Sequence, residues 1–257
     1  MAKEVSKDSL NNSITKAITI LDCFSYEKPR LRLKEISALT GINQATAYRM
    51  LNTLKEFNLI EQYEGSYSLG RGFLKYEGIV LNSIEIRRVG FPFLEELSNN
   101  LRVNANLAVL DENEVVYVAR AETLYCSYGY FHIGMRRPIY CTALGKVLAS
   151  RSPEVVKDVF KRGTTRFTLN TITDLDAFLA EIEKVRLQGY AVDFEEWNNG
   201  INCIAAPVFD STGEVAAGIS ISGPTSTYPQ EKILEYVPAL IEYAHRISAR
   251  LGAHGGL

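Results

Sequence analysis

The feature that most constrains the fold of this chain is a series of three helical patterns and one hairpin pattern within its first 72 residues. Apolar residues recur every three or four positions over 13–24, over 33–39 and again over 43–58, which predicts three amphipathic helices. Short strand patterns on either side of a turn over 59–69 predict a hairpin. Three helices followed by a hairpin are typical of a winged helix-turn-helix.

The ends of these helices carry residues that favour such positions. Ser13 is the expected N-cap of the first helix, and Asn43 is the expected N-cap of the third. Gly41 is expected to end the second helix, because glycine readily adopts the left-handed conformation that follows a helix C-terminus.

The third helical pattern has a polar face that could read DNA. With 100° between successive residues, Ala47, Met50, Leu51 and Leu54 share one side. The opposite side and its flanks carry groups that can pair with base edges or thymine methyl groups in a major groove. These candidates are Gln44, Ala45, Thr46, Tyr48, Arg49 and Asn52. A polar face that is only solvated, or that contacts another protein, would show the same pattern.

Other basic and hydroxyl side chains near the expected wing are candidates for phosphate contacts. They are Arg30, Arg32, Lys34, Tyr63, Ser66 and Tyr67. Residues 1–75 contain 11 Lys and Arg against 8 Asp and Glu, whereas the remainder contains 17 against 22. A mildly basic N-terminal region followed by an acidic remainder weakly favours a polyanionic partner for the N-terminal region.

The remainder of the chain mixes helical and strand patterns without regular β-α alternation, which predicts an α+β domain around an antiparallel sheet. Two hairpins are expected, from strands at 107–110 with 115–118 and at 201–209 with 214–222. A further aromatic strand is expected at 124–133. The expected helices cover 92–100, 142–150, 153–162, 175–188 and 229–251.

Polar residues inside these apolar segments suggest a ligand pocket. Ser220 and Ser222 are two apart on a strand and therefore face the same side. Asp193 and Cys203 interrupt other strand patterns, and the helix start at Thr142-Ala143-Leu144-Gly145-Lys146 can offer backbone N–H groups to an anion. Together they predict a pocket for a small carboxylate or hydroxylated acid, although each residue singly could simply pack in a core.

Enzyme and metal motifs are scarce in the sequence. The four cysteines form no C-x-x-C pair, and no His-x-x-x-His, G-x-S-x-G or phosphate-binding glycine loop occurs. The alternative function is a small-molecule-processing enzyme or a metal-dependent sensor that uses Cys203 and Asp193, with His132 as a conceivable third metal ligand. We expect no cofactor and no bound metal.

Targeting signals are also lacking. No apolar run approaches the roughly 18 residues of a membrane-spanning helix, and the first residues are charged where a signal peptide would be apolar. We therefore expect a cytoplasmic protein that does not bind membranes.

An ordered set of segments resembles the IclR family of bacterial transcriptional regulators. The segments cover residues 17–21, 35–36, 40–42, 45–54, 67–70, 138, 142–146, 200–207 and 220–224. The resemblance implies a winged helix-turn-helix over 10–72 that binds double-stranded operator DNA, a linker helix over 73–90, and an effector-binding and oligomerisation domain over 91–257. It also implies a curved antiparallel sheet flanked by helices, and a homodimer or homotetramer.

The resemblance further implies which residues contact a small-molecule effector. Carried over by position, they are Phe131, Ile133, Met135, Ala143, Leu144, Asp193, Cys203, Ser220 and Ser222. Members of the family often respond to organic or aromatic acids. Bulky Leu144 and the aromatic residues Tyr125, Tyr128 and Tyr130 depart from the family pattern. They favour a larger or aromatic acid over one the size of glyoxylate.

Overall fold

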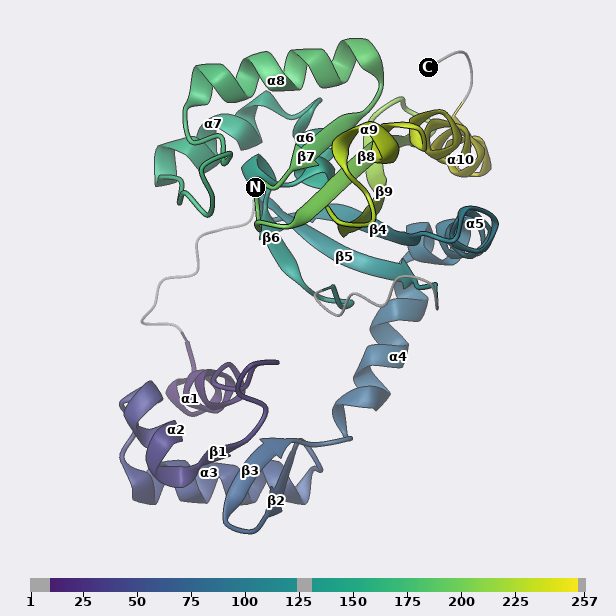
Figure 1. Ribbon diagram of the computed structural model, residues 1–257. Coiled ribbons are helices and arrows are strands. Elements are labelled where there is room, and N and C mark those ends of the chain that lie inside the picture. The colour runs from purple at the N-terminus through teal and green to yellow at the C-terminus, as the bar shows by residue number, and fades with distance from the viewer. Residues whose placement is uncertain (1–9, 124–130, 254–257) are drawn as a thin grey trace. The chain divides into compact units, whose positions relative to one another are not determined.

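The structure, a computed structural model, describes residues 10–123 and 131–253 and divides into two compact units, Met1–Leu81 and Asn82–Leu257 (Figure 1). The first unit is the expected winged helix-turn-helix. Its elements are α1 (Asn12–Leu21), β1 (Leu31–Arg32), α2 (Leu33–Thr40), α3 (Gln44–Glu56), β2 (Ile60–Tyr63) and β3 (Ser66–Leu69). The strands form an antiparallel sheet in the order β1-β3-β2.

Caps set the ends of the helices in this unit. Asn43 accepts a hydrogen bond from the Thr46 N–H at 2.9 Å, and Gly41 ends α2 with a φ of 70°, as expected. The expected cap at Ser13 is wrong. Asn11 caps α1 instead, since its side chain accepts hydrogen bonds from the N–H groups of Ser13 and Ile14.

The second unit is built on a six-stranded sheet in the order β6-β5-β4-β9-β8-β7, in which all neighbouring strands are antiparallel. The strands are β4 (Asn104–Asp111), β5 (Glu114–Ala121), β6 (Arg136–Pro138), β7 (Ala191–Phe194), β8 (Ile201–Phe209) and β9 (Val215–Pro224). Both expected hairpins are confirmed. Of the aromatic strand expected at 124–133, residues 124–130 lie outside the described residues and 131–133 are not a strand.

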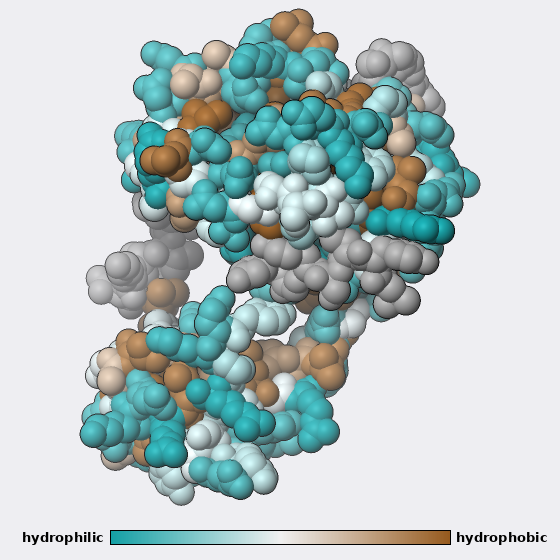
Figure 2. All heavy atoms as spheres, in the orientation of Figure 1, coloured by the Kyte–Doolittle hydropathy of each residue, from teal (hydrophilic) through white to brown (hydrophobic). Residues whose placement is uncertain are grey.

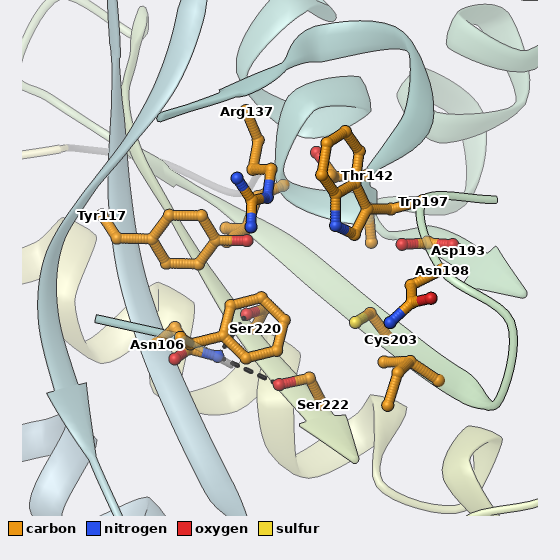
Figure 3. A pocket seen from close by; sticks show the side chains of 14 residues that line it. Asn106, Tyr117, Arg137, Thr142, Asp193, Trp197, Asn198, Cys203, Ser220 and Ser222 are labelled. Carbon is orange, nitrogen blue, oxygen red and sulfur yellow. Dashed lines mark hydrogen bonds between the residues drawn. The ribbon is translucent and has the colours of Figure 1, made fainter. Parts of the chain in front are cut away.

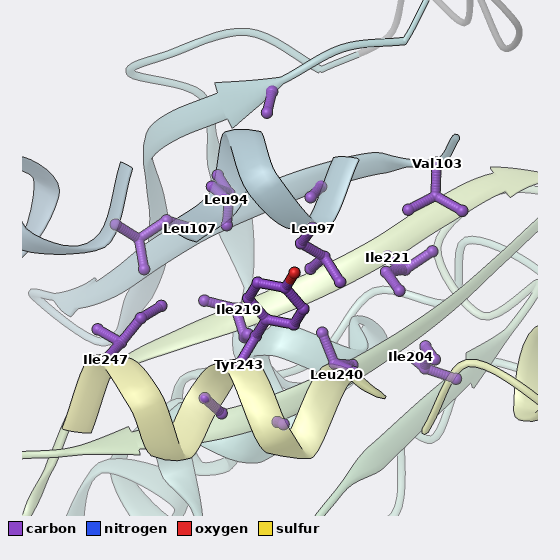
Figure 4. Close-up of a cluster of buried hydrophobic side chains, with 14 of the residues drawn as sticks. Leu94, Leu97, Val103, Leu107, Ile204, Ile219, Ile221, Leu240, Tyr243 and Ile247 are labelled. Atoms are coloured by element: carbon purple, nitrogen blue, oxygen red, sulfur yellow. The ribbon is translucent and has the colours of Figure 1, made fainter. Parts of the chain in front are cut away.

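Helices cover both faces of this sheet, and each face has its own apolar core. On one face α5 (Glu85–Leu101) and α10 (Val237–Arg250) pack on Leu107, Ile219 and Ile221 (Figure 4). On the other lie α6 (Ala143–Ala149), α7 (Pro153–Arg162) and α8 (Leu175–Gln188). Because side chains alternate along a strand, Ser220 and Ser222 face the α6 side.

Two expected helices are interrupted. The expected linker helix over 73–90 is α4 (Phe73–Ser83) followed by α5, with a break at Ile84, and α5 continues through Pro92. The expected last helix is α9 (Gln230–Leu234) and α10, with Pro238 in the first turn of α10. A proline there lacks the N–H that would continue the preceding helix. Within the described residues, no helix has both the length and the apolar character to span a bilayer.

Candidate functional site

The outer side of α3 is the first candidate site. Gln44, Ala45, Tyr48 and Arg49 are exposed, and Thr46 and Asn52 are half-buried. The inner side packs through residues such as Ala47 and Leu51, which are fully buried in the core of the first unit. The helix therefore presents to solvent the face expected from its periodicity.

The side chains expected to hold phosphates divide into exposed and buried groups. Arg30, Arg32 and Tyr63 are exposed, as is Lys34. Tyr67 is only 2% exposed, so its assignment as a DNA contact is wrong. The reason is that β3 is the central strand, with Leu31 and Gln62 paired on either side of Tyr67, whose ring packs into the core.

Two further basic residues line a hollow beside the wing together with Arg30 and Tyr63. Lys55 donates a hydrogen bond to Gln62 at 2.8 Å, and Arg71 pairs with Glu61 at 2.9 Å. Sequence reasoning missed both, because Lys55 lies in the last turn of α3 and Arg71 follows the expected wing strands.

The second candidate site is a pocket between the sheet of the second unit and the start of α6 (Figure 3). The empty space among its lining side chains, open solvent at its mouth included, is about 390 Å³. Its lining includes seven of the nine positions expected for effector contacts. They are Phe131, Ala143, Leu144, Asp193, Cys203, Ser220 and Ser222.

The other two expected positions do not line the pocket. Met135 is 4% exposed and belongs to the apolar core, and Ile133 lies in a turn that the Met135 N–H closes by donating to the His132 carbonyl. Their assignment as effector contacts, which the resemblance implied, stays a prediction.

Sequence reasoning missed six of the lining residues. They are Asn106, Tyr117, Arg137, Trp197, Asn198 and Ile201. Asn106 had a weak signal, because it is a polar residue inside the apolar strand segment 103–110. The others are ordinary surface or core residue types in sequence, and the order of the strands together with the connection between β7 and β8 brings them together.

The floor of the pocket is a buried polar cluster. The Asn106 amide donates to the hydroxyl of Ser220 at 3.3 Å and to that of Ser222 at 3.2 Å (Figure 3). All three residues are at most 2% exposed, and Asn106 lies directly opposite Ser220 in the β4–β9 pairing. The side-chain oxygen of Asn106 (Oδ1) has no hydrogen-bond partner among the described residues. The serine hydroxyls accept from the amide and can direct their own hydrogens to a ligand.

Asp193 and Cys203 lie next to each other across the β7–β8 pairing. Burial raises the pKa of Asp193 to about 8, with a further contribution from the nearby Glu196 carboxylate. Asp193 is therefore mostly protonated at pH 7 and can donate a hydrogen bond. Burial also raises the pKa of Cys203 well above its usual value, so the residue remains a thiol, which is a poor nucleophile and metal ligand.

A buried ion cluster supports the pocket from behind. Lys146 of α6 is 1% exposed and donates to Glu196 at 2.6 Å and to the Val192 carbonyl at 2.8 Å, with Glu181 of α8 at 3.4 Å. Asp193 accepts a hydrogen bond from the Glu196 N–H at 2.7 Å. The cluster joins α6, β7 and α8 to the segment that carries Trp197 and Asn198.

Aromatic rings form one wall of the pocket. The centroids of Tyr117 and Phe131 are 5.4 Å apart, and the Arg137 guanidinium carbon lies 4.2 Å from the centroid of the Trp197 ring. The conceivable zinc site is not supported, because the described residues contain no cluster of three or more metal-ligating side chains.

Comparison with known proteins identifies the family. Residues 13–64 match the IclR helix-turn-helix domain, and residues 78–249 match the bacterial transcriptional regulator IclR C-terminal domain. The chain belongs to the IclR family of transcriptional regulators. It is 36% identical to the Escherichia coli transcriptional regulator KdgR over 251 residues, which covers 95% of this chain and 94% of KdgR.

Solved structures of the family share the fold. The crystal structure of Thermotoga maritima IclR is 31% identical and superposes with a TM-score of 0.77, with 94% of this chain and 99% of that chain covered. An IclR homologue from Microbacterium hydrocarbonoxydans, solved as a complex with 4-hydroxybenzoate, has the same fold at 22% identity and a TM-score of 0.80, over 93% of this chain and 98% of that chain. This chain is therefore a DNA-binding transcriptional regulator with an effector domain, and the alternative of an enzyme is set aside.

Proposed function

We propose that the protein binds its operator through the outer face of α3 and that an organic acid in the pocket of the second unit changes its affinity for that operator. The buried cluster of Asn106, Ser220 and Ser222 carries the pocket assignment. Buried polar groups that face an empty space rather than a fully packed core are costly unless a ligand or water pairs with them.

The lining favours an acid with both polar and apolar parts. Protonated Asp193 and the two serine hydroxyls are donors for hydroxyl or carboxylate oxygens. Tyr117 and Phe131 offer an apolar wall on which an alkyl or aromatic body can pack. A hydroxylated aliphatic acid and a hydroxylated aromatic acid both satisfy this combination.

The α3 face supports DNA binding on simple chemical grounds. Arg49 can make a bidentate contact with guanine, Gln44 and Asn52 can pair with adenine, and Arg30, Arg32 and Tyr63 can hold flanking phosphates. Arg49 lies opposite the packed side of the helix, so a base contact requires no rearrangement of the core.

Exposed apolar residues of the first unit support a homodimer (Figure 2). On α1, Ile14 is 60% and Ile18 is 52% exposed, and on α4 none of the residues is buried while Leu74, Ile79 and Val80 are all more than half exposed. A second copy of the chain would cover such surfaces. A dimer of winged helices recognises a pseudo-palindrome with half-sites one helical turn, or a multiple of it, apart.

The test is DNA binding by the full chain to the regions that flank its own gene. We expect protection of a pseudo-palindromic site, affinity that falls steeply with salt because phosphate contacts release counterions, and a change in affinity when an organic acid is added. Protection of one asymmetric half-site by a monomer would contradict the dimer. Equal affinity for all DNA sequences would contradict operator recognition.

A further inference from the structure

One side of the pocket carries a guanidinium that neither the sequence patterns nor the positions expected for the family assign to the effector. Arg137 belongs to β6, one of the two edge strands of the sheet, and lines the pocket. Figure 3 shows its guanidinium near the Tyr117 hydroxyl, with Asn106, Ser220 and Ser222 on the other side of the cavity. The pocket thus has a cationic side and a neutral polar side.

Strand register explains why Arg137 points inward. Arg137 pairs with Val115 of β5, and Val115 shares a strand face with Tyr117, so Arg137 and Tyr117 project to the same side of the sheet. Arg136 is one residue away and projects to the opposite side. It pairs there with Glu114 at 2.6 Å and with Asp111 at 2.8 Å on the surface. Two adjacent arginines therefore have different surroundings.

The indole of Trp197 fixes the guanidinium in position. With the Arg137 Cζ 4.2 Å from the ring centroid, the two groups are close enough for a cation–π contact. One nitrogen of the guanidinium also donates a hydrogen bond to the Arg136 carbonyl at 3.1 Å, and a planar guanidinium carries several N–H groups of the kind that bind carboxylates. The side chain is thus ordered before a ligand arrives, which reduces the entropy cost of binding.

The charge of the lining favours an anion. Among the described residues that line the pocket, Arg137 is the permanent cation and Asp193 is the acid. At neutral pH Asp193 is mostly protonated because burial raises its pKa to about 8. Burial raises the pKa of the Tyr117 hydroxyl, and the positive charge of Arg137 acts to lower it, which agrees with the proximity of the two groups. The lining therefore carries a net positive charge at pH 7.

We propose that Arg137 binds the carboxylate of the effector and that the Asn106, Ser220 and Ser222 cluster binds a hydroxyl or carbonyl group at the other end of the same molecule. The effector is then a monocarboxylic acid whose second hydrogen-bonding group is remote from the carboxylate. This assignment rests on the proposed function of the pocket as the effector site. The competing anchor is the first turn of α6, but that helix has only seven residues and Thr142 already caps it through the Gly145 N–H.

Trp197 makes the test direct, because it is the single tryptophan of the chain and it lines the pocket. The full-length protein is titrated with 4-hydroxybenzoate and with glycerate, and each acid is matched with its neutral amide, 4-hydroxybenzamide or glyceramide. Indole emission reports occupancy, and titration calorimetry gives the affinity independently of the surroundings of the indole. We expect at least one acid to bind, and to bind about 10- to 100-fold more tightly than its amide.

Substitutions of Arg137 and of its neighbour Arg136 distinguish a direct contact between Arg137 and the carboxylate from a general effect of protein charge. Arg137→Met keeps the length of the side chain and removes its charge, so the acid should lose about 10- to 100-fold in affinity while the amide changes by less than about threefold. Arg137→Lys should give an intermediate loss, because lysine keeps the charge and lacks the planar fork. Arg136→Met removes the same charge one residue away and should leave the affinity for the acid unchanged.

The possible outcomes separate this proposal from the proposed function. Equal loss of acid and amide in Arg137→Met, no loss at all, or failure of both acids to bind the parent protein would each overturn the role of Arg137. If Arg137→Met keeps its affinity for the acid while the Ser220→Ala and Ser222→Ala double variant loses it, the pocket remains the effector site and the carboxylate binds at α6. If acid binding depends on Arg137 but operator affinity never responds to the acid, the assignment of Arg137 stands and the proposed regulation fails.

Discussion

The face of α3 and the pocket of the second unit use similar residue types, yet they are assembled in opposite ways. The α3 face comes from one 13-residue helix and is mostly exposed. The pocket draws at least one residue from each of the six strands, including Asn106, Tyr117, Arg137, Asp193 and Cys203, and its polar floor is buried. Substitutions on the outer face of α3 should therefore change function alone, whereas substitutions in the pocket or in the ion cluster that supports it should also change stability.

The largest effect on stability is expected for Lys146→Met. The change leaves Glu196 buried without its cation, and breaking a buried ion pair in this way costs about 3–5 kcal/mol. Urea denaturation measures the free energy of unfolding. The matched control is Lys184→Met, because Lys184 also pairs with Glu181, at 3.1 Å, but its side chain is 69% exposed. The control should cost less than about 1 kcal/mol, and similar costs for the two variants would contradict the supporting role of the cluster.

The next largest effect is expected for Ser220→Ala combined with Ser222→Ala. The ligand loses two hydrogen-bond partners, and the Asn106 amide loses both of its acceptors. Each unmade buried hydrogen bond costs about 1–3 kcal/mol, so the affinity for the acid should fall by roughly tenfold or more per lost bond. Titration calorimetry measures this loss. Operator affinity without the acid should be unchanged, and a double variant that responds at the same acid concentration as the parent would place the effector elsewhere.

Arg49→Ala tests whether the outer face of α3 binds the operator. Loss of a bidentate base contact should weaken operator binding by roughly 1–3 kcal/mol, because Arg49 is exposed on the face opposite the core. Fluorescence anisotropy with labelled DNA measures the affinity at several salt concentrations. The melting temperature and the Trp197 response to acid should equal those of the parent. Unchanged operator affinity at every salt concentration would remove α3 from the interface.

A smaller, pH-dependent effect is expected for Asp193→Asn. Because the folded-state pKa of Asp193 is about 8, against about 3.9 in an unfolded chain, the folded parent binds more protons between these values and loses stability as the pH rises. Glu196 strengthens this shift, and Lys146 opposes it. Asparagine does not ionise, so the variant should gain stability over the parent by at least about 1 kcal/mol more at pH 8 than at pH 5. Thermal unfolding at both pH values checks this, and a gain that does not change with pH would show that Asp193 is ionised in the folded protein.

The contrast between the two sites also explains what the sequence could predict. The α3 face follows from helical periodicity alone, and the shared orientation of Ser220 and Ser222 follows from their spacing along one strand. Asn106 and Arg137 join the pocket through pairing with other strands, and Trp197 joins it from the connection between β7 and β8; no local sequence pattern encodes these positions.

The errors have local physical causes. Tyr67 looked like a wing residue that could reach DNA, but the two-residue strand β1 is too short to be seen in the sequence and places Tyr67 in a central strand. Ile133 was expected at the end of a strand over 124–133, but it lies in a turn that ends before β6 begins at Arg136. The cap of α1 was predicted at Ser13, but Asn11 caps the helix. Both residue types favour an N-cap, and the spacing of the apolar residues does not distinguish the two positions.

The most direct test of effector-controlled DNA binding uses one operator fragment and one acid that binds the parent protein. Operator affinity is measured by anisotropy with and without the acid for the parent, for Arg49→Ala and for the Ser220→Ala and Ser222→Ala double variant. We predict that the acid shifts the operator affinity of the parent, that the double variant binds the operator without responding to the acid, and that Arg49→Ala loses the operator but keeps its Trp197 response. A double variant that responds like the parent, or an operator affinity of the parent that the acid never shifts, would contradict the account.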